Sequence, residues 1–214
     1  MWLPQMNERV NVVFVGQTGV GKSSLINMIR GIPDHSQAAA RVGRSARAVT
    51  LHTACYSSVL TTGLQCQLWD TQGLDATTDD HLIVHQTPEF IYYPTIFMWC
   101  IQTTKIDFPI YWQQLHKAYV EYCHKTPGRR KAIPVIVITQ MAPNVTGWEL
   151  KCRNQIRQLG LRVGHYDIDG VLLLRVRKHR GASSPEYTED SKALRDHISQ
   201  LAHNPPTPHF PAFF

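Results

Sequence analysis

A short apolar run that leads directly into a glycine-rich loop constrains this chain more than any other feature. Residues 10–15 are mostly β-branched and apolar, residues 16–23 follow the pattern Gly-x-x-x-x-Gly-Lys-Ser, and residues 25–30 suit a helix. The order of strand, glycine loop and helix is the context that a phosphate-binding loop requires. The loop therefore predicts a nucleotide-binding protein.

The residue types in this loop fit the chemistry of a polyphosphate. Main-chain N–H groups of residues 17–23 must point inward around the anion, and glycine allows backbone conformations that a side chain would block. We expect Lys22 to reach the β- and γ-phosphates, Ser23 to place its hydroxyl on Mg²⁺, and the helix to aim its positive end at the anion. The predicted nucleotide-binding residues of the loop are Gly16, Gln17, Thr18, Gly19, Val20, Gly21, Lys22, Ser23 and Ser24.

Composition places the chain among globular proteins, because 43% of its 214 residues are apolar and 18% are charged. The net charge of +6 favours anionic ligands, but the basic clusters at residues 128–131 and 175–180 are typical of solvated loops, so no nucleic-acid partner is expected. Five cysteines without a Cys-x-x-Cys spacing, and no secretory leader, favour a reducing, cytoplasmic location. No apolar run approaches the ~20 residues of a transmembrane segment.

Apolar strands alternate with amphipathic helices along the chain, which predicts an α/β fold. Continuous apolar runs at residues 95–101 and 133–138 are typical of strands buried on both faces, whereas residues 53–60 and 64–69 alternate and form a hairpin. We expect a three-layer P-loop NTPase fold with a mainly parallel six-stranded sheet, one antiparallel edge strand and helices on both faces. The other predicted elements are helices at residues 110–124, 147–158 and 185–202 and a strand at 170–176.

A second chemical signal follows the strand predicted at residues 64–69, where Asp70 and Gly73 form an Asp-x-x-Gly pattern. An acidic residue at such a strand end can hold Mg²⁺ through water, and the N–H of Gly73 can bond a γ-phosphate. Alone, the pattern is typical of a turn, but the preceding phosphate loop favours the functional interpretation. Asp70 and Gly73 are therefore predicted to bind the nucleotide.

A third signal is a threonine in the long polar segment between the first helix and the hairpin. Thr50 is the candidate for the threonine that completes the Mg²⁺ shell when a γ-phosphate is present, with Ser45 and Thr53 as alternatives. A segment of this length inside a compact domain is usually functional or mobile. The predicted metal ligands are Ser23, Thr50 and Asp70.

These features resemble the translation-factor-related GTPases, most closely the septin-like and immunity-associated (avirulence-induced) GTPases and a set of small fungal G-domain proteins. Beyond the phosphate loop, the matching segments are residues 49–50, 69–75, 137–141, 164–165 and 187–194. The resemblance covers about residues 9–202. It implies Mg²⁺-dependent binding of GTP and GDP, slow GTP hydrolysis, a two-state switch and a homodimer across the nucleotide face.

The segment that recognises the base departs from the family pattern. Guanine is normally selected by Asn/Thr-Lys-x-Asp, whose carboxylate takes both N–H groups of the base edge. The matching residues are Thr139, Gln140, Met141 and Ala142, so the acidic partner is absent. Thr139 and Gln140 are the candidate base-binding residues, and GTP, ATP and relaxed specificity all stay open.

The hydrolytic residues also depart from the pattern. Many GTPases orient the attacking water with a Gln directly after the Asp-x-x-Gly glycine, and that position is Leu74, which cannot bond water. Gln72 is the nearest substitute. The predicted catalytic set is Lys22, Thr50, Gln72 and Gly73, and the expected enzyme is a slow GTPase.

The predicted domain organisation is a G domain at residues 1–203 followed by a proline-rich tail at residues 204–214, outside the packed domain. Two alternative functions stay open. One is an ATP-dependent enzyme such as a small-molecule kinase, for which the basic stretch at residues 175–180 would anchor the substrate. The other is a nucleotide-binding assembly module with little hydrolysis.

Overall fold

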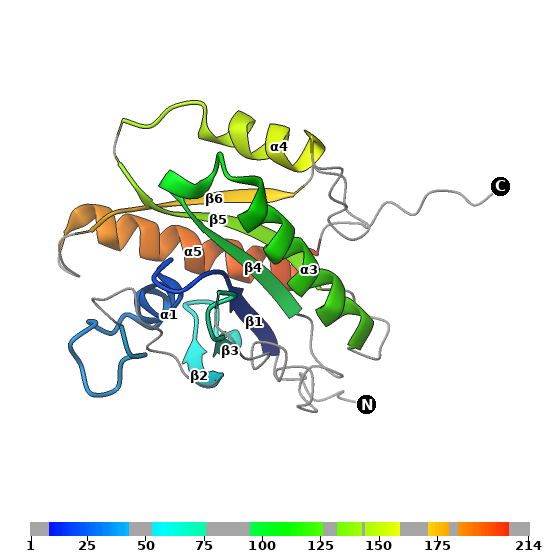
Figure 1. Cartoon of the computed structure of the whole chain (residues 1–214). Coiled ribbons are helices and arrows are strands. Elements are labelled where there is room, and N and C mark those ends of the chain that lie inside the picture. The colour runs from blue at the N-terminus through cyan, green and yellow to red at the C-terminus, as the bar shows by residue number, and fades with distance from the viewer. Residues whose placement is uncertain are drawn as a thin grey trace.

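A six-stranded mixed sheet with helices on both faces forms the protein (Figure 1). The computed structural model describes residues 9–42, 53–75, 95–125, 132–142, 144–158, 171–179 and 184–205. The strand order is β2-β3-β1-β4-β5-β6, in which β2 and β3 are antiparallel and the other neighbours are parallel. The elements are β1 (Arg9–Val15), α1 (Lys22–Arg30), β2 (Ala54–Val59), β3 (Gln65–Asp70), β4 (Thr95–Gln102), η2 (Thr103–Lys105), α3 (Pro109–Lys125), β5 (Ile133–Met141), α4 (Trp148–Gln158), β6 (Leu172–Arg177) and α5 (Pro185–His203). The predicted fold, with one antiparallel edge strand, is confirmed.

Alternate side chains of the central strand β1 enter cores on opposite faces of the sheet. Val12 and Phe14 pack in one core with residues of α1 and α5, and Val13 and Val15 pack in the other with residues of α3 and α4. Figure 1 shows α3 and α5 on opposite sides of the sheet. Strands covered on both faces need apolar side chains in both directions, which accounts for the continuous apolar runs.

The hairpin of β2 and β3 lies at the edge of the sheet and is covered differently. Side chains of β2 alternate between half-buried and exposed, and those of β3 alternate between half-buried and buried. The Leu60 N–H donates to the Leu64 carbonyl at 3.0 Å and closes the turn, which contains Gly63 at a φ of 82°. The alternation that predicted this hairpin therefore reflects an edge with one covered face.

The parallel strands bring their carboxyl ends, and the predicted site residues, to one edge of the sheet. Phe14 pairs with Asp70 across β1 and β3, and Gln102 pairs with Thr139 across β4 and β5. The predicted end of β5 at residue 138 is wrong, because the strand continues to Met141 with an irregularity after Ile138. Thr139 is buried and hydrogen-bonded, so its polarity does not end the strand.

The C-terminal end of the described chain is helical. Helix α5 ends at His203, directly before the predicted tail, and residues 206–214 lie outside the described residues. Among the ranges given above, no helix combines the length and the apolar character that crossing a bilayer requires.

Candidate functional site

The phosphate loop joins β1 to α1 at the carboxyl edge of the sheet. Gly21 caps α1 with a φ of 102°, and the Leu25 N–H donates to the Gly21 carbonyl at 2.9 Å. The first turn of α1 carries no acidic side chain. Helix N-termini attract anions through their N–H groups and dipole, so the helix start and the loop together favour a phosphate.

The beginning of the loop is held between β4 and α3. A Cβ atom at Gly16 would collide with the carbonyl oxygen of Cys100, so only glycine permits this approach. Next to it, Gln17 Nε2 donates to Gln114 Oε1 of α3 at 3.0 Å. These contacts fix the first residues of the loop relative to the sheet.

Lys22 folds back across the loop that it follows. Its side chain is buried, and Nζ donates to the Gly16 carbonyl at 2.9 Å and to the Gln17 carbonyl at 3.0 Å. Burial lowers the pKa of Lys22, and the nearby carboxylates of Asp70 and Asp75 partly oppose this shift. The structure thus places the ammonium inside the loop, where a phosphate would meet it.

Ser23 and Asp70 meet although 47 residues separate them. Ser23 Oγ donates to Asp70 Oδ2 at 2.7 Å, and Asp70 is almost fully buried at the end of β3. A hydroxyl and a carboxylate are oxygen ligands of the kind that Mg²⁺ prefers. These two of the three predicted metal ligands are therefore together and suited in chemistry to the ion. The third predicted metal ligand, Thr50, belongs to residues 43–52, which lie outside the described residues.

The residues after Asp70 turn against the loop. The Thr71 hydroxyl donates to the Phe14 carbonyl at 2.6 Å, and Gln72 is buried. Leu74 is half-buried against the core on the α3 and α4 side, and its N–H donates to the Gly16 carbonyl at 3.2 Å. The water-positioning role of Gln72 stays a prediction.

Asp75 is a site residue to which the sequence had assigned no role. One of its oxygens, Oδ1, accepts from the Thr18 N–H at 2.8 Å and from the Thr18 hydroxyl at 2.7 Å. Gly73 makes this possible, because a Cβ there would collide with the Thr18 hydroxyl and lie 2.6 Å from the Thr18 nitrogen. Partial burial by itself raises the pKa of Asp75. The hydrogen bonds from Thr18 and the charge of Lys22 lower this pKa by a larger amount, so the net shift is downward.

The predicted base-binding residues lie on the loop backbone. Thr139 Oγ1 donates to the Val20 carbonyl at 2.7 Å and to the Ile101 carbonyl at 3.3 Å. Gln140 has a φ of 55°, and its Nε2 donates to the Gly19 carbonyl at 3.2 Å. Both residues therefore hold the loop in place, and base contact by either stays a prediction.

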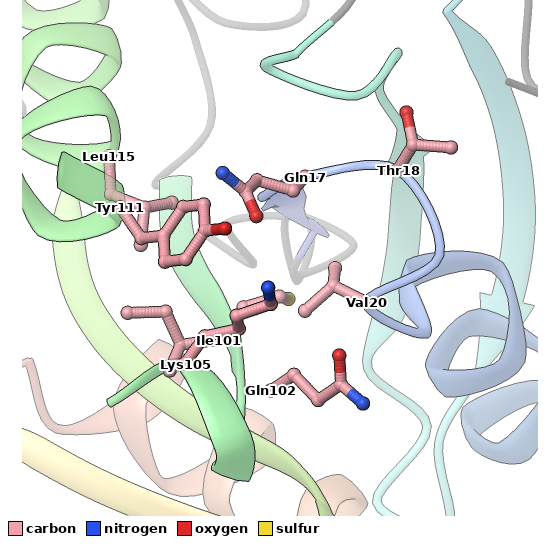
Figure 2. Close-up of a pocket in the computed structure, with 9 residues that line it drawn as sticks. Gln17, Thr18, Val20, Ile101, Gln102, Lys105, Tyr111 and Leu115 are labelled. Carbon is pink, nitrogen blue, oxygen red and sulfur yellow. The ribbon is translucent and has the colours of Figure 1, made fainter. Parts of the chain in front are cut away.

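A small pocket of about 50 Å³ lies on the α3 side of the loop (Figure 2). Figure 2 shows Gln17 and Tyr111 turned toward one another across it, while Thr18 points away. The pocket is lined by Gln17, Thr18, Val20, Cys100, Ile101, Gln102, Lys105, Tyr111 and Leu115. It adjoins the loop beside Gln17 and Val20.

The chain that leaves α1 is tied back to that helix. Asn27 is fully buried, donates to the Ala40 carbonyl at 2.9 Å and accepts from the Ala40 N–H at 2.7 Å. Its Nδ2 also donates to Asp34 Oδ1 at 2.8 Å, and Ser24 Oγ lies 3.4 Å from Asp34 Oδ2. The predicted mobile segment is therefore anchored as far as residue 40.

The comparison with protein families identifies a match over the first part of the chain. The family model for interferon-inducible GTPases (IIGP) matches residues 4–81, which include the phosphate loop and residues 70–73. A search of curated proteins gave no match.

Solved structures match the chain over nearly its whole length. It is similar to a dimerisation-deficient mutant of Toc33 from Arabidopsis thaliana, with 17% identity, a TM-score of 0.63, and coverage of 94% of this chain and 87% of that chain. It is also similar to a structure described as showing that dimerisation is important for the GTPase activity of the chloroplast translocon components atToc33 and psToc159. That match has 19% identity, a TM-score of 0.55, and coverage of 96% and 87%. At these identities, the likeness establishes the shared fold.

Proposed function

We propose that this chain is a small P-loop GTPase that acts as a Mg²⁺-dependent guanine-nucleotide switch with slow hydrolysis. The observation that carries the proposal is the hydrogen bond between Ser23 and Asp70, next to the buried Lys22. An anion-binding loop, a cation inside it and two oxygen ligands for a metal at its edge are the parts that a Mg·nucleotide requires.

Magnesium binding is supported by the chemistry of the ligands. Ser23 would bind the ion through its hydroxyl, and Asp70 would hold it directly or through water. When bound, the ion neutralises charge on the β- and γ-oxygens of the nucleotide. The hydrogen bond between Ser23 and Asp70 holds these two proposed ligands next to one another.

The switch is proposed to lie in the residues that follow Asp70. Gly73 packs against Thr18 of the phosphate loop, and the N–H of the glycine in an Asp-x-x-Gly pattern can bond a γ-phosphate. Loss of that phosphate on hydrolysis would release the segment. We propose that Thr50 adds a further contact that depends on the γ-phosphate, so Thr50→Ala should weaken triphosphate binding more than diphosphate binding.

The proposal of slow hydrolysis is supported by the side chain at position 74. A leucine there packs against the core and has no group that can orient water. Gln72 is buried. We propose that a group supplied by a second copy of the chain accelerates the reaction. The relation between dimerisation and GTPase activity described for atToc33 and psToc159 supports a homodimer across the nucleotide face.

Guanine selection is proposed without the usual carboxylate. In the described chain, Thr139 and Gln140 support the loop, and Met141 is buried. An exposed alanine follows at position 142, and it has no side-chain acceptor for the N–H groups of guanine. We therefore expect a smaller preference for GTP over ATP than a carboxylate provides, since a lost buried hydrogen bond can remove several kcal/mol of discrimination.

Two measurements test the proposal. Competition of GTP, GDP and ATP for the Mg²⁺-loaded protein should give tighter binding of the guanine nucleotides, and equal or tighter binding of ATP would favour the kinase alternative. Single-turnover release of phosphate should then be slow and should quicken with protein concentration if a dimer assists. Triphosphate binding without any phosphate release would instead favour the alternative of a nucleotide-binding assembly module. Lys22→Ala, which removes the ammonium group from the phosphate loop, is the negative control for nucleotide binding.

A further inference from the structure

Asp34 lies beside the first turn of α1, in the segment that returns from the end of that helix. Its Oδ1 accepts from Asn27 Nδ2 at 2.8 Å, and its Oδ2 lies 3.4 Å from Ser24 Oγ. Asn27 is fully buried and bonds both main-chain groups of Ala40, so it is a firmly held donor. The carboxylate is therefore oriented from within the protein, while Asp34 itself is exposed.

This carboxylate lies next to the part of α1 that is expected to bind phosphate. Side chains of a helix tilt toward its N-terminus, so the Ser24 hydroxyl extends toward the start of α1. Main-chain N–H groups of a phosphate loop cradle the α- and β-phosphates, and the lysine reaches the β- and γ-phosphates. The sugar of a nucleotide is bonded to the α-phosphate. Through its contact with Ser24, Asp34 is therefore placed on the side of the loop where the sugar begins.

Helix α5 lies close to the same carboxylate. Burial raises the pKa of the Tyr187 hydroxyl, in the first turn of α5, and the nearby charge of Asp34 raises it further. The two helices are joined by the Ser191 hydroxyl, which donates to the Met28 carbonyl of α1 at 2.8 Å. Asp34 thus lies at the corner between α1 and α5, at the edge of the sheet that also carries the phosphate loop.

The chemistry of Asp34 fits a sugar better than a phosphate. Its Oδ2 has only a long contact with Ser24, and a carboxylate oxygen with two lone pairs can accept shorter bonds. Phosphate oxygens are acceptors of like charge, whereas the hydroxyls of ribose are donors. A hydroxyl that donates to a carboxylate forms a short, charge-assisted bond, and acidic residues bind ribose in this way in dinucleotide-binding folds.

We infer that Asp34 binds the ribose hydroxyls of the nucleotide and makes the site selective for ribonucleotides over nucleotides that lack these hydroxyls. The inference rests on the proposed function, because it needs a nucleotide whose α-phosphate lies at the start of α1. Asn27 is then a positioning residue that holds the carboxylate toward the sugar. The selection is independent of the base, so it adds to the binding of the purine whether or not guanine is preferred.

Removal of the carboxylate and removal of the hydroxyls together test the inference. The affinities of wild type and Asp34→Ala for GDP and for 2′,3′-dideoxy-GDP are measured by calorimetry in saturating Mg²⁺. Wild type should prefer GDP by about tenfold, the scale of one charge-assisted hydrogen bond at an exposed site. Asp34→Ala should bind the two nucleotides about equally, because its loss of affinity falls on GDP alone.

Two further variants complete the experiment. Asp34→Asn keeps the size of the side chain and an acceptor but loses the charge, so it should lower the preference for GDP by a smaller factor. Asp107→Ala removes a carboxylate from an exposed ion pair with Lys151 and should keep the preference of wild type. A melting curve of each variant checks that it is folded, and if Asp34→Ala is not, Asp34→Asn decides the outcome.

The outcomes separate this inference from the proposed function. If Asp34→Ala weakens the binding of both nucleotides by the same factor, Asp34 supports only the fold, and the ribose role is wrong. Equal affinity of wild type for GDP and 2′,3′-dideoxy-GDP would also overturn it. In both cases the proposed function stands, because wild type still binds GDP. If wild type binds neither nucleotide, both fail.

Discussion

Ser23 and Asp70 are joined by a hydrogen bond of 2.7 Å because the strands that precede them are neighbours. β1 and β3 run parallel, and Phe14 near the end of β1 pairs with Asp70 at the end of β3. The phosphate loop then carries Ser23 back over this edge of the sheet. The topology thus places a hydroxyl from one segment beside a carboxylate from another.

The first prediction concerns this pair. Asp70→Asn keeps the size of the side chain but removes its charge, and it should weaken Mg²⁺ affinity in the presence of GDP by about 10–100-fold, as for other residues that support a metal. The measurement is a Mg²⁺ titration of nucleotide affinity. Asp107→Ala, with the same loss of charge at an exposed site, should leave the Mg²⁺ midpoint unchanged. An unchanged midpoint in Asp70→Asn would assign the carboxylate another role.

The second prediction concerns the support of the loop by β5. Thr139→Val removes the hydroxyl that donates to the carbonyls of Val20 and Ile101, so these buried carbonyls lose a hydrogen-bond donor. The free energy of unfolding should fall by about 1–3 kcal/mol, and nucleotide affinity should fall with it. Chemical denaturation and a GDP titration measure the two effects. Thr188→Val, at an exposed site on α5, should change neither, and a similarly silent Thr139→Val would show that the contact is dispensable.

The architecture was largely predictable because local patterns reflect burial. The runs at residues 95–101 and 133–138 are apolar in both directions since helices cover both faces of the sheet there. Residues Trp148, Cys152 and Ile156, spaced by one helical turn, are the buried positions of α4. In these elements, neighbouring residues alone indicate which side chains meet the core.

The site was predictable only in part, because its contacts join distant segments through backbone atoms. The loop and Asp70 carry recognisable spacings, but the bond from Thr18 to Asp75 depends on how closely the chain approaches at Gly73. Likewise, nothing near Asn27 in the sequence indicates that it holds Ala40. Such contacts have no local pattern and emerge only with the fold.

The structure also bears on the kinase alternative. In the basic stretch at residues 175–180, Arg177 is engaged by Asp190 at 2.8 Å and by Glu189 at 2.8 Å. These bonds raise the pKa of Arg177 and fix β6 to α5. A guanidinium held in this way has a structural role, so the stretch supplies less support for a substrate-anchoring site than its composition suggested.

The third prediction concerns the segment after α1. Asn27→Ala removes three hydrogen bonds of a fully buried side chain, two of them to Ala40, so the free energy of unfolding should fall by about 2–3 kcal/mol. Hydrogen exchange of the Ala40 N–H should become faster. Asn154→Ala, at an exposed position of α4, is the matched control. Unchanged exchange would show that other contacts hold the segment.

The fourth prediction concerns alkaline pH. Burial raises the pKa of Cys66, Cys100 and Cys152 from 9.0 to about 12. Because the folded-state pKa is the higher one, each thiol contributes stability below pH 9 that is lost as the pH rises toward 12. The loss is at most about 1.4 kcal/mol per pH unit for each thiol.

Denaturant unfolding at several pH values between 9 and 11 measures this loss. Cys66→Ala should make the decline of the free energy of unfolding shallower, whereas a substitution of the exposed Cys55 should not. Parallel declines in wild type and Cys66→Ala would contradict the thiol assignment.

The central claim is that the phosphate loop, with Lys22 inside it, binds the phosphates of a nucleotide. Calorimetric titration of wild type, Lys22→Ala and Lys151→Ala with a non-hydrolysable GTP analogue and Mg²⁺ tests it most directly, because Lys151 offers the same loss of charge at an exposed position. The account predicts saturable binding by wild type and Lys151→Ala, and none by Lys22→Ala. Equal binding by all three proteins, or no heat from wild type, would contradict it.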